Sequence, residues 1–138
     1  MSGIVIDASA LGPILFEDEP DRIAELDARF EHSDLVVPSN WSREVTSMIL
    51  IAERRQRIDA RERTRLISLA AAIPADPDPD SFRQGWKAAS ALAIAHGLTV
   101  YDAAYLELAS RRGLPLATLD RDLAAAAQRE GIEVFTVS

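Results

Sequence analysis

The sequence predicts an α/β protein of three layers, in which helices cover both faces of a mostly parallel five-stranded sheet. Short apolar, β-branched runs alternate along the chain with longer segments that have the apolar periodicity of helices. Parallel strands are joined through helices, and a parallel sheet needs a helical layer on each face. The length of 138 residues is that of one domain with a complete hydrophobic core.

Five segments have the composition of buried strands. The first is a β-branched run that ends at Asp7, and the third is the weakest of the five. In chain order, the expected strands are residues 3–6, 34–38, 73–75, 114–119 and 133–137.

The helices are recognised by their periodicity and by the residues at their ends. Ser39 or Asn40 is suited to cap the third helix, and Gly97, Gly113 and Gly131 are suited to end the last three. The expected helices are residues 9–17, 20–31, 41–57 and 59–71, then one from the turn at 76–80 to residue 96, and finally 99–112 and 120–130.

The composition excludes several classes of protein. The chain has no cysteine, so it has no disulfide framework, no thiolate zinc site and no cysteine nucleophile. The N-terminus lacks the basic and apolar regions of a secretion signal, and no apolar run approaches the length of a membrane span. We therefore expect a soluble, cytoplasmic protein.

The charge is unevenly distributed. A net charge of −7 argues against general affinity for nucleic acid, which depends on neutralisation of phosphates. A cluster of arginines nevertheless occupies the junction of two expected helices and could bind RNA or an acidic part of a partner protein. The alternative is a solvated helical hairpin with ion pairs to Glu53, Asp59 and Glu62. The cluster consists of Arg54, Arg55, Arg57, Arg61, Arg63 and Arg65.

Three aspartates are expected at one edge of the sheet. In such sheets the ligand site lies beyond the carboxyl ends of the strands, where the strand order reverses. Asp7 follows the first strand, Asp120 follows the fourth, and Asp102 lies in a first helical turn after Thr99. Taken singly, each has a structural alternative, since aspartate is favoured as a helix cap or in a capping box.

Glu44 is a fourth candidate. It borders an apolar stripe on the third helix, where an ionised carboxylate is costly unless something pairs with it. Pairing with Arg43, or extension of the side chain into solvent, is one explanation; a metal ion is the other. The stripe consists of Trp41, Val45, Met48, Ile49 and Ala52.

Together the four acids indicate a metal site. Carboxylates that gather within a few ångströms repel one another unless they take up protons or share a cation. Oxygen ligands of this kind favour Mg²⁺ or Mn²⁺, which can activate water for hydrolysis of a phosphodiester. A bound cation also reverses the local charge where a phosphate must approach.

Four segments resemble the motifs of PIN domains in order, spacing and overall length. They are residues 4–9, 37–45, 101–109 and 118–123, which contain Asp7, Glu44, Asp102 and Asp120 respectively. The subgroup that the chain most resembles is that of the VapC-type toxins of bacterial toxin–antitoxin pairs. The resemblance extends over essentially the whole chain.

This resemblance implies a PIN-like three-layer fold and Mg²⁺-dependent endoribonuclease activity. It implies that Asp7, Glu44, Asp102 and Asp120 bind metal and act in catalysis, and that Asp122 is an auxiliary metal-site acid. The hydroxyls of Ser9 and Thr118 would support the ligands. It also implies an RNA substrate, a homodimer, and a cognate antitoxin whose C-terminal tail crosses the active-site groove. At Ser47, three residues after the second acid, the chain departs from the asparagine of many relatives.

Several aromatic and histidine residues have structural explanations. Trp86 shares a helical face with Phe82 and is expected in the core or at a dimer interface. Tyr101 and Tyr105 could stack on bases or pack beside Asp102. His32 and His96 lie near helix ends without the spacing of metal ligands.

Two other functions fit parts of the sequence. A phosphatase or phospho-acceptor domain would use Asp7 as nucleophile, but residues 8–12 contain no second acid and Lys87 is the sole lysine. A noncatalytic interaction module would keep the fold and bind a partner without turnover. Metal binding and cleavage assays distinguish these possibilities.

Overall fold

In the computed structural model, which describes residues 3–16 and 33–135, five parallel strands form one sheet in the order β3-β2-β1-β4-β5. This confirms the predicted fold class. The expected helix at 20–31, His32 and the end of the last expected strand lie outside the described residues. The strands are β1 (Gly3–Ile6), β2 (Asp34–Val37), β3 (Ala75–Pro77), β4 (Leu116–Ala117) and β5 (Val134–Phe135).

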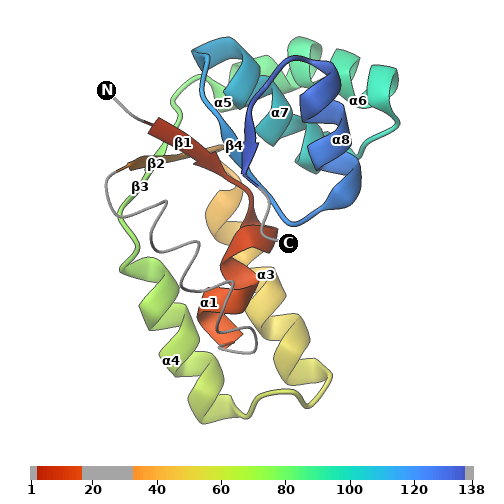
Figure 1. The fold of residues 1–138 in the computed structure, drawn as a ribbon. Coiled ribbons are helices and arrows are strands. Elements are labelled where there is room, and N and C mark those ends of the chain that lie inside the picture. Colours follow the sequence, from red (N-terminus) through yellow and green to blue (C-terminus); the bar gives the residue numbers. More distant parts are fainter. Residues whose placement is uncertain (1–2, 17–32, 136–138) are drawn as a thin grey trace.

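Helices lie on both sides of this sheet. Figure 1 shows α5, α6, α7 and α8 on one side and α1, α3 and α4 on the other. A 3₁₀ turn at Ala8–Leu11 and a π-turn at Gly85–Ala89 are the irregular segments. The helices are α1 (Gly12–Phe16), α3 (Trp41–Arg54), α4 (Ala60–Ala71), α5 (Ser81–Gln84), α6 (Ser90–His96), α7 (Val100–Arg112) and α8 (Arg121–Arg129).

The strand order reverses at β1. This strand pairs with β2 on one side and with β4 on the other, so Val5 lies beside both Val36 and Leu116. Just beyond β1, the backbone N–H of Asp7 donates to the carbonyl of Ala117 at 3.0 Å. The carboxyl ends of β1 and β4 therefore meet at the place where a sheet of this kind binds its ligand.

Several predicted elements differ from the structure in their bounds. The third strand is residues 75–77 rather than 73–75, because Ala75–Pro77 pairs with Leu35–Val37 while the N–H of Ile73 still bonds to Ala70 at the end of α4. Pro77 is tolerated because β3 is an edge strand.

The helix expected to end at residue 96 is also not continuous. It is divided into α5, the π-turn and α6. The hydroxyl of Ser90 donates to the carbonyl of Gly85 at 3.0 Å, which supports the wider turn. The expected stops at Gly97 and Gly113 are confirmed, since both have a left-handed backbone (φ 66° and 64°) at a helix C-terminus.

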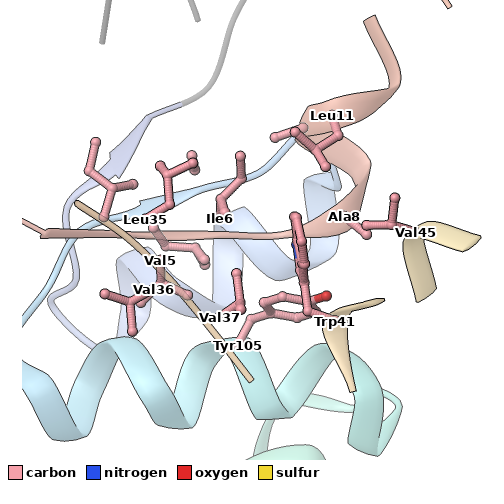
Figure 2. Packing of buried hydrophobic residues seen from close by; sticks show 14 of the residues in the cluster. Val5, Ile6, Ala8, Leu11, Leu35, Val36, Val37, Trp41, Val45 and Tyr105 are labelled. Atoms are coloured by element: carbon pink, nitrogen blue, oxygen red, sulfur yellow. The ribbon is translucent and has the colours of Figure 1, made fainter. Parts of the chain in front are cut away.

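The core lies where β1 and β2 meet α3 and α7. Figure 2 shows strand residues such as Val5 and Val36 in one buried cluster with Trp41 of α3 and Tyr105 of α7. This packing fixes the N-terminal turns of α3 and α7 beside the carboxyl ends of the strands. Within the described residues, no helix has the length and apolarity that crossing a membrane requires.

Candidate metal centre at the carboxyl edge of the sheet

Asp7 is the most enclosed of the candidate acids, with only 4% of its surface exposed. One of its oxygens, Oδ2, accepts hydrogen bonds from the Ser9 hydroxyl at 2.6 Å and from the Thr118 hydroxyl at 2.7 Å. Burial raises the pKa of this carboxyl despite the two donors, and the negative charge of Asp120 raises it further. Asp7 is thus a fixed carboxylate for which a nearby cation would be favourable.

The two hydroxyls that hold Asp7 also hold the segment after β4. The Ser9 hydroxyl accepts from the backbone N–H of Leu119, and the Thr118 hydroxyl accepts from that of Asp120, both at 3.0 Å. The supporting position expected for these hydroxyls is therefore present in the structure. Each joins the end of β1 to the end of β4, so the positions of Asp7 and Asp120 depend on each other.

Asp120 is both a helix cap and a neighbour of the other candidate acids, the two alternatives that the sequence offered for it. It is the N-cap of α8, where its Oδ1 accepts from the N–H of Leu123 at 2.9 Å. It also lies close enough to Asp7 and Asp102 for its charge to raise the pKa of both. Capping occupies one carboxylate oxygen and leaves the second available to a metal ion.

Asp102 enters the site from the first turn of α7. Thr99 caps this helix, its hydroxyl accepting from the N–H of Asp102 at 3.1 Å. The pKa of Asp102 is raised by burial and then by the charges of Asp120 and Asp7, with a smaller contribution from Asp122. The helix cap therefore fixes the backbone at Asp102, while the carboxyl group lies within reach of the negative charges of the other acids.

Glu44 is neither paired with Arg43 nor extended freely into solvent, the two structural explanations that the sequence offered for it. Arg43 is exposed and forms no ion pair among the described residues. Instead, Oε1 of Glu44 accepts from Nδ2 of Asn40 at 2.7 Å and from the hydroxyl of Tyr105 at 3.2 Å. Burial raises the pKa of Glu44 to about 7, and the charges of Asp7 and Asp102 add to this effect.

Asn40 and Tyr105 are site residues that sequence reasoning missed. Asn40 was expected to cap α3, but its side chain makes no cap hydrogen bond and bonds to Glu44 four residues later. Tyr105 is fully buried, so the prediction that it could stack on bases is wrong, whereas Tyr101 is 61% exposed. Burial and the adjacent Glu44 raise the pKa of Tyr105, so its hydroxyl remains a donor.

The four acids influence one another electrostatically, and the described residues provide no ion-paired cation to balance them. In the described part of the chain, no Lys, Arg or His forms an ion pair with any of them. Nor do any three described acids or histidines enclose a metal position by themselves. The arrangement is an open one, in which water or a substrate phosphate would complete the coordination of a cation. Asp122 is exposed in the first turn of α8.

The raised pKa of Glu44 gives a pH dependence that can be measured. In metal-free protein, the folded state holds this proton more tightly than the unfolded chain, so the free energy of unfolding should fall as the pH rises from about 4.5 to about 7. The raised pKa values of Asp7 and Asp102 act in the same direction. Chemical denaturation in the presence of a chelator should show this decline, and Glu44→Gln should reduce it. An equal decline in both proteins would contradict the assignment.

Two other predictions can be compared with the structure. Trp86 and Phe82 pack edge to face with ring centres 6.4 Å apart, but they are 77% and 75% exposed, so a place in the core is wrong. In the arginine cluster, two of the expected ion pairs exist, Arg63–Glu53 at 2.9 Å and Arg65–Glu62 at 3.0 Å. The third acid, Asp59, caps α4 instead.

Comparison with known proteins identifies one family. Residues 4–136 match the family model for the PIN domain. Ribonuclease VapC3 of Pyrobaculum aerophilum is 33% identical over 121 residues, which are 88% of this chain and 92% of that protein.

Solved structures share the fold. PAE2754 of Pyrobaculum aerophilum has a TM-score of 0.64 and 23% identity, and the match covers 96% of this chain and 90% of that one. VapBC2 of Rickettsia felis, bound to a DNA fragment from the promoter, has a TM-score of 0.67 and 7% identity, with 98% of each chain covered. At these identities the two structures support the fold alone.

Proposed function

Because this chain belongs to the PIN-domain family, we propose that it is a metal-dependent endoribonuclease that acts as the toxin of a toxin–antitoxin pair. The observation that carries this proposal is the group of four acids at the carboxyl edge of the sheet. Burial and neighbouring acids raise the pKa of Asp7, Glu44 and Asp102, and no Lys, Arg or His of the described residues forms an ion pair with any of the four. The relative named as a VapC ribonuclease supports the same activity. The reaction is hydrolysis of an RNA phosphodiester.

The donor set suits Mg²⁺, with Mn²⁺ as a possible substitute. All of the donors are carboxylate oxygens, and Mg²⁺ in proteins is commonly held by one or two carboxylates together with water and substrate phosphate. Asp7, Asp102 and Asp120 would hold the ion, Glu44 would help to bind it or to position water, and Asp122 would be auxiliary. The ion would lower the pKa of a water molecule and stabilise charge on the phosphodiester oxygens.

The protein residues keep this group in place. The hydroxyls of Ser9 and Thr118 hold Asp7, so the carboxylate does not have to reorganise when the substrate arrives. Asn40 and Tyr105 both donate to one oxygen of Glu44, which leaves Oε2 for a cation or water. Without a cation, Glu44 is only partly ionised near neutral pH, and a neighbouring positive charge would lower its pKa and favour the ionised form.

Metal-dependent cleavage is the direct test. We expect the purified protein to cut single-stranded RNA with Mg²⁺ or Mn²⁺, to stop when a chelator is added, and to resume when the metal is restored. Cleavage that continues in the chelator would contradict a metal-dependent mechanism. Failure to bind either ion in calorimetry, together with an absence of cleavage, would favour the noncatalytic interaction module.

The toxin role requires a cognate antitoxin that neutralises the nuclease. Its C-terminal tail would cross the carboxylates and place a basic side chain there, since no Lys, Arg or His of residues 3–16 and 33–135 forms an ion pair with these acids. Expression of the chain alone should arrest bacterial growth, and coexpression with the small protein encoded beside it should restore growth. Restoration by an unrelated small protein would argue against a cognate pair.

The exposed rings of Phe82 and Trp86 suit the proposed homodimer. Large apolar side chains at this exposure are unusual on an isolated surface, and aromatic residues are enriched at protein interfaces. Replacing both with serine should shift the protein from dimer to monomer in sedimentation experiments. An unchanged sedimentation coefficient would place the dimer interface elsewhere.

A phospho-acceptor function at Asp7 has less support. A nucleophilic carboxylate must be reached by the phosphoryl group, yet Asp7 is 4% exposed and one of its oxygens carries two hydrogen bonds. The hydroxyl contacts suit a positioned metal ligand better than an attacking group.

A further inference from the structure

We propose that one flank of α3, formed by Arg43, Ser47 and Arg54, binds the phosphate backbone of the RNA beside the carboxylates. We call this surface the α3 flank. The proposal rests on the nuclease function above and adds to it the surface along which the substrate lies. The sequence placed only Arg54 of these residues in the arginine cluster and did not include Arg43.

Helical geometry places the α3 flank next to Glu44. Arg43 and Ser47 are four residues apart, and Arg54 follows Ser47 by two further turns, so the three side chains share one face. Ser47 is also three residues from Glu44. The flank therefore begins beside the candidate metal centre and extends about 15 Å along the helix.

The opposite flank of the helix is buried, so the orientation of α3 is fixed. Trp41, Val45 and Ile49 pack into the core and are at most 7% exposed. Glu44 lies at the border between this buried face and the α3 flank. A chain that runs over the flank can therefore reach the carboxylate group without α3 having to move.

The α3 flank is shallowly hollowed. Arg43, Ser47 and Arg54 line a shallow hollow of about 310 Å³ with three neighbours from the same helix. Those neighbours are Ser42, Thr46 and Leu50. The hydroxyl of Thr46 donates to the carbonyl of Ser42, whereas the hydroxyls of Ser42 and Ser47 and the two guanidinium groups belong to exposed residues.

Neither arginine of the α3 flank forms an ion pair with an acid among the described residues, in contrast to two arginines of the adjacent helix. Arg63 and Arg65 form ion pairs with Glu53 and Glu62. Arg43 and Arg54 are exposed and are not within ion-pair distance of any acid in residues 3–16 and 33–135. Two unpaired guanidinium groups with a hydroxyl between them are suited to phosphate oxygens.

Charge complementarity favours RNA as the occupant. The protein carries a net charge of −7, and its candidate centre is acidic, so RNA is repelled unless positive groups lie on its path. The α3 flank supplies such groups directly beside Glu44, where the substrate has to enter. An acidic segment of the antitoxin is a different class of ligand and is an outcome of the test below.

The test measures binding separately from cleavage. A labelled single-stranded RNA of about 20 nucleotides would be titrated with the full chain carrying Asp7→Asn, so that it is not cut, across about 50 to 200 mM KCl. Adding Arg43→Gln and Arg54→Gln should weaken binding about tenfold at low salt. The slope of log K against log salt should become shallower by about 1.4, since each phosphate contact on a single strand contributes about 0.7.

A matched variant controls for net charge. Arg83→Gln with Lys87→Gln removes the same charge from exposed residues of α5 and the π-turn, and it should leave the affinity and the slope nearly unchanged. An equal loss of RNA affinity in both double variants would overturn the proposal. Unchanged RNA affinity in the variant with Arg43→Gln and Arg54→Gln would also overturn it. Unchanged RNA binding with weaker antitoxin binding would assign the α3 flank to the partner protein and would also overturn it. If the unmodified protein binds RNA through the α3 flank with this salt dependence but does not cleave it, the nuclease function would be contradicted while the proposal for the α3 flank would stand.

Discussion

Replacing Asp7 with asparagine is expected to reduce RNA cleavage by about a thousandfold or more, because residues that only support metal ligands already contribute about 10- to 100-fold. Asparagine has nearly the same shape, and its oxygen can accept the hydrogen bonds from Ser9 and Thr118. The fold should therefore survive while the negative charge is lost. Cleavage rates at saturating Mg²⁺, together with thermal unfolding, would measure the two effects separately. Asp102→Asn should have a comparable effect on the rate.

The matched control for this substitution is Asp34→Asn. Asp34 is exposed at the first residue of β2, at the opposite end of a parallel strand from the candidate centre. The same chemical change there should leave the cleavage rate unchanged. Full activity in purified Asp7→Asn, or an equal loss in Asp34→Asn, would contradict the assignment of the acids.

Thr118→Val should destabilise the protein by about 2–4 kcal/mol, because it leaves the backbone N–H of Asp120 without its hydrogen-bond partner and removes one of the two hydroxyl donors to the buried carboxylate of Asp7. Thr118 is fully buried, and its hydroxyl donates to Asp7 while accepting from the N–H of Asp120. Valine has the same shape, so the loss arises from the hydroxyl rather than from a cavity. Denaturant unfolding of the metal-free protein would measure it.

The size of this loss should depend on pH. Without the donor, the pKa of Asp7 rises further, so the penalty is largest where the carboxylate is charged and smaller where it is protonated. We therefore expect a greater destabilisation at about pH 8 than at about pH 5. Thr118→Ser keeps the hydroxyl and should cost about 1 kcal/mol for the lost methyl group, with little dependence on pH. The same loss in serine and valine variants would show that the hydroxyl is not the cause.

Local signals in the amino-acid sequence are sufficient to predict the class of fold and the segments that contribute acids. The periodicity of apolar residues, the capping residues and the helix-ending glycines are local signals. They correctly predicted the alternation of strands and helices, including the helix ends at Gly97 and Gly113. The position of an acid directly after a strand is also local information. For this reason Asp7 and Asp120 were expected at the same edge of the sheet, where β1 and β4 do end side by side.

The contacts of each side chain, in contrast, follow from the folded chain and not from local sequence. The bond from Tyr105 to Glu44 joins residues 61 positions apart, and the bond from Thr118 to Asp7 joins residues 111 positions apart. Local preference suggested Ser39 or Asn40 as a helix cap, whereas the side chain of Asn40 bonds to Glu44. Local preference also placed Trp86 in the core or at a dimer interface, and its exposure in the folded chain excludes the core. Backbone conformation follows from neighbours in sequence, whereas hydrogen bonds and burial depend on which segments the folded chain brings together.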